Sequence, residues 1–203
     1  RTTCVFHLAT GANITTMSSI NLAANNPCLI LRDSSSVSLN TNNVFNHIAA
    51  SVNGPISITN AANNSSTVAS LTDDLGTVNC VNATGARNIS LINSGSGNIN
   101  VNSNVSSGSG VISLTAGTNV VINAGNISTT GNVNLTGTAG TINEAGAGTI
   151  SGALLTTSSV GGTTLGNANT VTSFNATNTT SGNVSLTNTA APLTITGIAQ
   201  SGG

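Results

Sequence analysis

The chain contains very little charge, with three basic residues, all of them Arg, and four acidic residues among 203. Three cations cannot neutralise a row of phosphates, so we expect no nucleic-acid partner. The shortage of charge also excludes two common compositions, the charged disordered segment and the Lys- and Glu-rich helical domain.

Aromatic rings and long apolar runs are scarce as well. Trp and Tyr are absent and Phe occurs three times, so an aromatic-rich globular core is not expected. No apolar run approaches the ~20 residues of a membrane-spanning helix, and we expect no membrane insertion. The chain begins at Arg1 and ends at Gly203 within a repeat, from which we expect a processed product or a piece of a longer chain.

The residues that are present form short apolar pairs separated by one polar residue, such as Ile89/Leu91 and Ile112/Leu114. A spacing of two places both side chains on one face of a strand. Gly-Ser, Asn-Gly and Asn-Asn steps between the pairs supply the backbone conformations of tight turns. Because no sustained helical spacing occurs, the pattern predicts many strands of 4–6 residues and no helices.

The pairs recur at a period of about 21–22 residues, which is typical of a repeat fold. The period predicts an all-β, single-stranded parallel β-solenoid with about 21–22 residues per coil and roughly nine coils, in which like side chains stack rung on rung. A β-sandwich built from hairpins is the alternative. Two interleaved series define the predicted core ladders, with Val68, Ile89, Ile112, Val133 and Leu155 in the first, and Val37, Ile56, Val78, Ile99, Val120 and Ile142 in the second.

Composition changes near residue 85. All three Cys, both His and most of the charge precede this point, and the chain after it is richer in Gly. We interpret 1–203 as one continuous β-solenoid, with less regular, Cys-containing coils over 1–85 and Gly/Asn/Thr-rich regular coils over 86–203. A division into two domains is the alternative.

The few ionisable residues predict no catalytic, cofactor-binding or metal site. Asp73 and Asp74 are adjacent, so on a strand they would face opposite ways, and we expect a turn there rather than an acid/base couple. Glu144 has no acidic neighbour, and the imidazoles of His7 and His47 have no motif of a Ser-His-Asp triad around them. We therefore expect no enzymatic activity and no cofactor.

The three cysteines have spacings that relate to the coils. Cys4 and Cys28 are separated by about one coil, which would bring their Cα atoms to ~5 Å, within the range of a disulfide. We name Cys4 and Cys28 as the disulfide candidate. Cys80 is about two and a half coils farther on, and we interpret it as a small buried hydrophobic residue, with an intermolecular disulfide as the alternative.

Four segments resemble the repeats of a known protein family. These segments are SGSGNINV (94–101), SGSGVISLTAG (107–117), GNVNLTGTAGTI (131–142) and SGNVSLTNTAAPLTITGI (181–198). Over roughly 86–203 the chain is similar to filamentous-haemagglutinin-like and autotransporter-type β-helix adhesins of Gram-negative bacteria. The resemblance implies a right-handed parallel β-helix, export across the outer membrane, and attachment to hosts, surfaces or neighbouring cells. It places the protein outside the cell or on the bacterial cell surface.

Three functions follow as hypotheses. The first is an extracellular structural and adhesive rod, a segment of a large secreted surface adhesin. The second is a self-assembling subunit of a β-solenoid filament, whose partners would be copies of itself joined end to end rather than the continuation of a longer chain. The third is an ice-binding solenoid, suggested by short Thr-x-Thr stretches near the C-terminal end, at Thr170/Thr172, Thr177/Thr179, Thr187/Thr189 and Thr194/Thr196.

Overall fold

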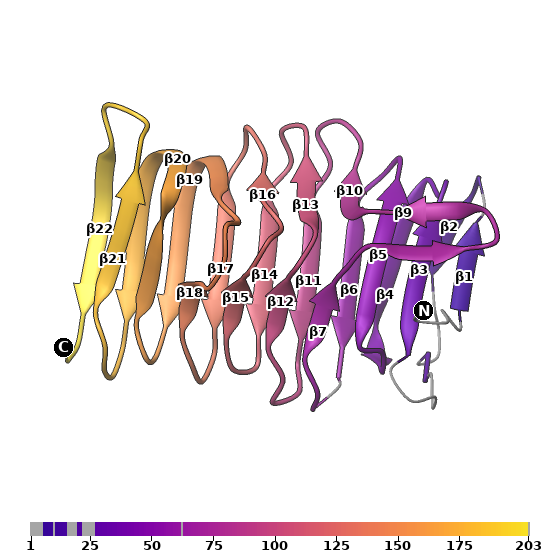
Figure 1. Cartoon of the computed structure of the whole chain (residues 1–203), viewed down its shortest axis with the longest axis horizontal. Coiled ribbons are helices and arrows are strands. Elements are labelled where there is room, and N and C mark those ends of the chain that lie inside the picture. The colour runs from indigo at the N-terminus through magenta and orange to yellow at the C-terminus, as the bar shows by residue number, and fades with distance from the viewer. Residues whose placement is uncertain (1–5, 10, 16–19, 22–26, 62, 203) are drawn as a thin grey trace.

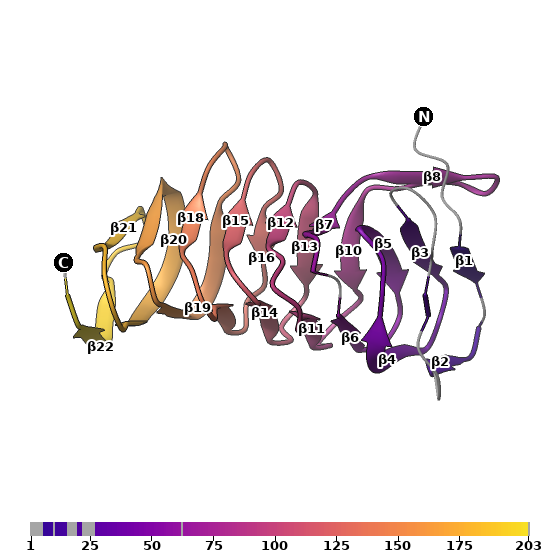
Figure 2. The same ribbon diagram turned by 90° about the horizontal axis from the view of Figure 1, so that it is seen from below.

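The computed structural model describes residues 6–9, 11–15, 20–21, 27–61 and 63–202. Every regular element in these residues is a β-strand, and the strands stack into a rod of about eight turns (Figures 1 and 2). The predicted all-β parallel β-solenoid is therefore confirmed, with one turn fewer than the nine expected.

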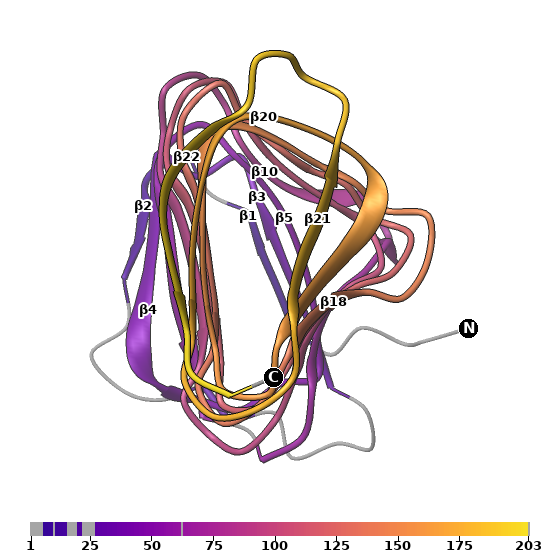
Figure 3. The same ribbon diagram turned by 90° about the vertical axis from the view of Figure 1, so that its left-hand side faces the viewer.

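The turns contribute strands to three faces of the rod, which Figure 3 shows end on, and strands of the second face begin at residue 66. The first face contains β2 (Asn13–Thr15), β4 (Ser36–Asn43), β6 (Ile56–Asn60), β11 (Ile89–Asn93), β14 (Ile112–Ala116), β17 (Val133–Gly137) and β22 (Thr194–Gln200). The second face contains β7 (Ser66–Val68), β12 (Ile99–Val101), β15 (Val120–Ile122), β18 (Ile142–Glu144) and β21 (Val184–Asn188). The third face contains β1 (Phe6–Ala9), β3 (Cys28–Arg32), β5 (His47–Val52), β10 (Cys80–Ala83), β13 (Asn104–Ser107) and β16 (Ile127–Ser128).

Two long strands turn the corners between faces. β19 (Ile150–Ser159) pairs with β16 on the third face and with β17 on the first. β20 (Thr163–Asn178) pairs with β18, β19, β21 and β22, so it runs through all three faces. A separate antiparallel hairpin, β8 (Leu71–Asp73) and β9 (Gly76–Val78), lies outside the solenoid.

The core of the first face is a ladder of apolar side chains in parallel register. The predicted stacking of Ile89, Ile112, Val133 and Leu155 is confirmed, and all four side chains are buried. The complete sequence of partners along this ladder is Ile14, Val37, Ile56, Ile89, Ile112, Val133, Leu155, Phe174 and Ile195.

On the second face, Ile99, Val120 and Ile142 stack in register as predicted, and all three are buried. The next partners along this ladder are Thr163 and Val184. One side chain per turn at each of these positions removes apolar surface from water, which is the main favourable term in folding.

The early members of the two predicted series require correction. Val68 pairs with Val101 on the second face, whereas Val37 and Ile56 pair with each other on the first face. Val78 is buried, but it lies in the β8–β9 hairpin rather than in either ladder. The hairpin inserts additional residues between β7 and β10. A constant step of 21–22 residues along the chain therefore connects strands of one face before the hairpin to strands of another face after it.

The turns between strands depend on close approach of neighbouring coils. Gly117 lies in the turn after β14, and a Cβ atom there would collide with the carbonyl oxygen of Gly95 in the preceding coil.

Buried Asn side chains form hydrogen bonds with backbone carbonyl groups at the corners of the coils. Asn60 donates from Nδ2 to the carbonyl oxygen of Phe45 over 2.7 Å, and Asn43 donates to that of Leu39 over 2.8 Å.

Strand pairing continues across the composition change near residue 85. β10 pairs with β5 on its N-terminal side and with β13 on its C-terminal side. Our interpretation of 1–203 as one continuous solenoid stays a prediction consistent with this pairing.

Candidate functional site

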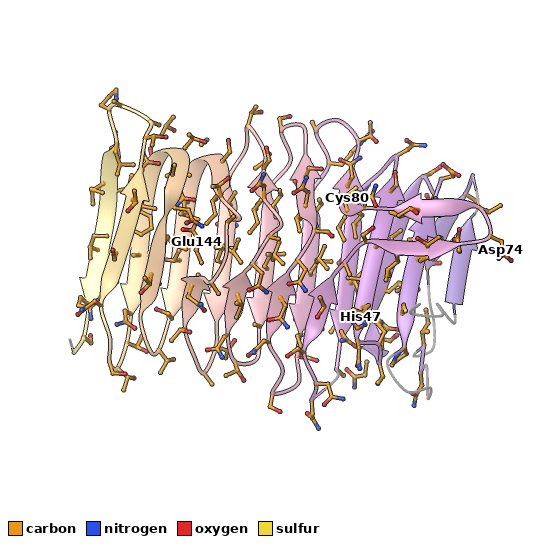
Figure 4. All side chains as sticks on the ribbon, viewed as in Figure 1. His47, Asp74, Cys80 and Glu144 are labelled. Carbon is orange, nitrogen blue, oxygen red and sulfur yellow. The ribbon has the colours of Figure 1, made fainter. Side chains whose placement is uncertain are left out.

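Four of the ionisable side chains lie apart from one another along the rod. In Figure 4, His47, Asp74, Cys80 and Glu144 occupy separate places and do not point toward one another. Within the described residues, no three His, Cys, Asp or Glu side chains lie close enough together to hold a metal ion.

The β8–β9 hairpin covers part of the third face, over the N-terminal coils (Figure 1). Cys28, Ile30 and Ala49 form a buried cluster there with Leu71 and Val78 of the hairpin. This cluster lies outside the main core, which holds the alternate residues of β3. The run Cys28–Arg32 is consequently covered on both sides of the sheet, which accounts for its continuous apolar sequence.

An ion pair fixes the hairpin to the solenoid. Arg32 donates from Nη2 to Oδ1 of Asp73 over 2.8 Å and from Nε to Oδ2 over 3.2 Å, and Nη2 also donates to the carbonyl oxygen of Gly76. The two side chains are only 15% and 11% exposed. Two parallel bonds between a guanidinium and a carboxylate hold both groups in a defined orientation, so Asp73 has a structural role.

The predicted turn at Asp73 and Asp74 is confirmed. Asp73 pairs with Gly76 across the hairpin, and Gly76 has a φ of 113°, in the region that favours glycine. Asp74 and Leu75 form the exposed tip, where the Leu75 side chain is 66% exposed. Asp73 thus ends a hairpin strand and pairs with Arg32, whereas Asp74 lies in the turn.

The disulfide prediction is not tested, because Cys4 lies outside the described residues. Cys28 is completely buried under the hairpin. Cys80 is half-buried, and this burial raises the pKa of its thiol. A raised pKa keeps the thiol protonated at neutral pH, which makes it a poor nucleophile.

The imidazole of His47 is held in its neutral form. Its burial lowers the pKa, since removal from water disfavours the charged ring. Its Nδ1 atom is buried and has no hydrogen-bond partner within the described residues. Among the described residues, no hydrogen bond joins the ring to a carboxylate.

Glu144 occupies a position that sequence analysis missed. It pairs with Ile122, a core residue of the second face, so its side chain takes an inward place in the ladder. Its Oε2 atom accepts a hydrogen bond from the backbone N–H of Asn167 over 2.6 Å, and its Oε1 atom is buried without a partner among the described residues. The alternation Ile142-x-Glu144 is the signal that could have identified it.

The environment of Glu144 opposes ionisation. Burial raises the pKa of the carboxyl, and hydrogen bonds from Asn167, Asn169 and Gly166 oppose that rise in part. Glu144 is also the only carboxylate side chain after residue 75.

The outer surface of the first face carries two regular rows of side chains, all of them polar except Ile92. We call these two rows the hydroxyl face. All twelve positions are half-buried and uncharged. The inner row is Ser57, Ser90, Ser113, Asn134, Thr156 and Asn175, and the outer row is Thr59, Ile92, Thr115, Thr136, Ser158 and Thr177.

The Thr-x-Thr stretches near the C-terminal end do not form one array. Thr177 pairs with Ser158 on the first face, whereas Thr170 pairs with Ser151, which continues the third face. Thr187 lies in β21 on the second face. These stretches therefore do not make a common surface, because successive pairs fall on different sides of the coil.

Comparison with protein-family models finds no match, and comparisons with curated proteins and with solved structures find none either. No helix in the described part of the chain is long and apolar enough to cross a membrane.

Proposed function

We propose that the chain is a structural and adhesive segment of an extracellular rod, part of a large secreted bacterial surface protein. Its backbone geometry suits this role, because each turn stacks in parallel register on the one before it and extends the rod by a strand spacing of ~4.8 Å. The repeats over 86–203, which resemble those of secreted bacterial adhesins, support the same assignment.

The C-terminal coil supplies the observation that carries the proposal. Ile195 and Ile198 of β22 are in register with the buried residues Phe174 and Ala176, yet they are 54% and 48% exposed. Leu186 and Leu193 are only partly buried against the core. These apolar side chains continue the core ladders, and a further coil stacked on β21 and β22 would bury them.

The covering coil has two sources under this proposal and its alternative. In the adhesin, it is continuing polypeptide of the same chain. In a filament, it is the first coil of a second copy, and the contact is heterologous, so that it gives open fibres rather than closed dimers. Both sources use the same main-chain pairing of parallel strands.

The size of the native polypeptide distinguishes the two sources. Surface material from the producing cells would be denatured without reducing agent and probed with an antibody against residues 86–203. We expect a single polypeptide far larger than the 19.7 kDa of this chain. Release of chains of about that mass would contradict the adhesin segment and support the filament subunit. Protease treatment of intact cells, which should remove the signal, tests the surface location.

A further inference from the structure

The outer row of the hydroxyl face differs from the turns in the use of its hydroxyl groups. In the turns, Thr side chains bond to the neighbouring coil, as Thr130 does to the carbonyl oxygen of Gly108 over 3.0 Å. In the outer row of the hydroxyl face, no hydroxyl has a hydrogen-bond partner within the described residues. These unpaired hydroxyls belong to Thr59, Thr115, Thr136, Ser158 and Thr177. They keep both a donor and acceptor lone pairs for an external partner.

The positions of these hydroxyls are fixed in two directions. Adjacent strands place them ~4.8 Å apart along the rod, and the two rows are ~6.8 Å apart across it. The strands of this face lie along one side of the cross-section from β4 to β22 (Figure 3). Half-burial and the stiff χ1 of Thr restrict the side chains further. The result is a two-dimensional lattice of hydroxyl and amide groups, interrupted in the outer row by Ile92.

The charge, the spacing and the side-chain types of the hydroxyl face indicate which kind of extended ligand it can bind. An ionic surface would require charges, and none of the twelve positions carries one. A single polymer chain would need only one row. A sugar surface is usually recognised through exposed aromatic rings, whereas none of the twelve positions of the hydroxyl face is aromatic. A ligand that repeats in two directions, carries no charge and bonds equally to donors and acceptors is a lattice of ordered water.

We propose that the hydroxyl face binds the surface of ice. The rows hold hydroxyl groups at fixed spacings, so waters bound to them are ordered before contact with the crystal. Adsorption then joins these waters to the ice lattice and does not require the hydroxyls to be stripped of water. Ice binding by this face does not depend on the length of the native polypeptide. Failure of the ice-binding proposal would therefore leave the proposed adhesive rod unaffected, and the reverse also holds.

The test is the partition of the fluorescently labelled chain into a slowly growing ice hemisphere, together with inhibition of ice recrystallisation. The double variant Thr115→Tyr/Thr136→Tyr places two bulky rings on adjacent coils of the hydroxyl face. The matched control is Ser106→Tyr/Ser128→Tyr, whose positions are in register on adjacent coils of the third face. Tyr is well tolerated in strands, and equal melting temperatures of the three proteins verify the fold.

We expect the unmodified chain and the third-face control to enter the ice, and we expect the hydroxyl-face variant to be excluded from it. Exclusion of the unmodified chain would overturn the proposal. Equal loss of incorporation in both variants would overturn it as well, because binding would not then depend on this face.

Discussion

Replacement of Ile112 by Ala tests the stacking of side chains that holds the rod together. Ile112 is fully buried and lies in register between Ile89 of the preceding turn and Val133 of the following turn. The substitution therefore weakens two neighbouring interfaces of the ladder. In a repeat fold these interfaces, together with the intrinsic stability of each coil, make up the stability of the whole.

The magnitude follows from the carbon atoms removed. At ~0.8 kcal/mol for each buried carbon, loss of the outer part of the Ile112 side chain costs roughly 2.4 kcal/mol. The cavity left between two rigid rungs adds to this, and such substitutions in well-packed cores cost about 2–5 kcal/mol. We expect a decrease of about 3–4 kcal/mol in the free energy of unfolding.

Ile92→Ala is the matched control, because it is the same substitution at a half-buried outward position in β11, the strand that pairs with β14 on the same face. It should cost about 1 kcal/mol, since much of its surface is already in water. Urea unfolding followed by far-UV circular dichroism gives both values from the midpoints at equal slope. Equal losses for Ile112→Ala and Ile92→Ala would refute the inward ladder.

Further substitutions test individual features of the fold. Glu144→Gln should raise the free energy of unfolding at neutral pH but leave it unchanged at a pH below the ordinary carboxyl pKa. The pKa of Glu144 is raised in the folded state, so the wild-type chain loses stability as the pH rises and this carboxyl ionises. Melting temperatures of both proteins across the pH range measure the difference. Asp73→Ala should cost roughly 2 kcal/mol in hairpin stability by leaving Arg32 unpaired, which faster amide exchange in the hairpin would reveal. Gly117→Ala should lower the melting temperature through its collision with the preceding coil, whereas Gly166→Ala, with open space around it, should leave it nearly unchanged.

The regular part of the fold could be predicted from sequence because inward residues repeat with few exceptions. Ile112 and Leu114 occupy the same places in their turn as Val133 and Leu135 do in the next, and the spacing between them is one coil. Period two along a strand and period 21–22 along the chain together fix both the face and the rung.

The β8–β9 hairpin accounts for what the period did not predict. Its sequence contains short β-rich segments like those of the coils, so Val78 is indistinguishable from a ladder residue by pattern alone. Only the pairing of Leu71 with Val78, and their burial against Cys28, shows that these residues form a cover outside the solenoid. Val37, Ile56 and Val68 fall in the wrong predicted series for the same reason.

The candidate surfaces depended on register, which composition does not reveal. In sequence, Thr115 and Thr136 cannot be distinguished from the many other Thr residues of the chain. Only the strand register of the structure places them next to each other in one row. Glu144 presents the opposite difficulty. It has no acidic neighbour in sequence and therefore attracts no functional interpretation, although its place in the alternation puts it among core residues.

In the solenoid, each turn advances the rod by one strand spacing while the same face stays in register. Spin labels at Ser57 and Asn175, five rungs apart in the inner row, should give a distance of about 24 Å by electron paramagnetic resonance. Moving the second label to Thr156, one rung nearer, should shorten that distance by about 4.8 Å. A distance that stays the same or increases on this move would contradict the stacked solenoid.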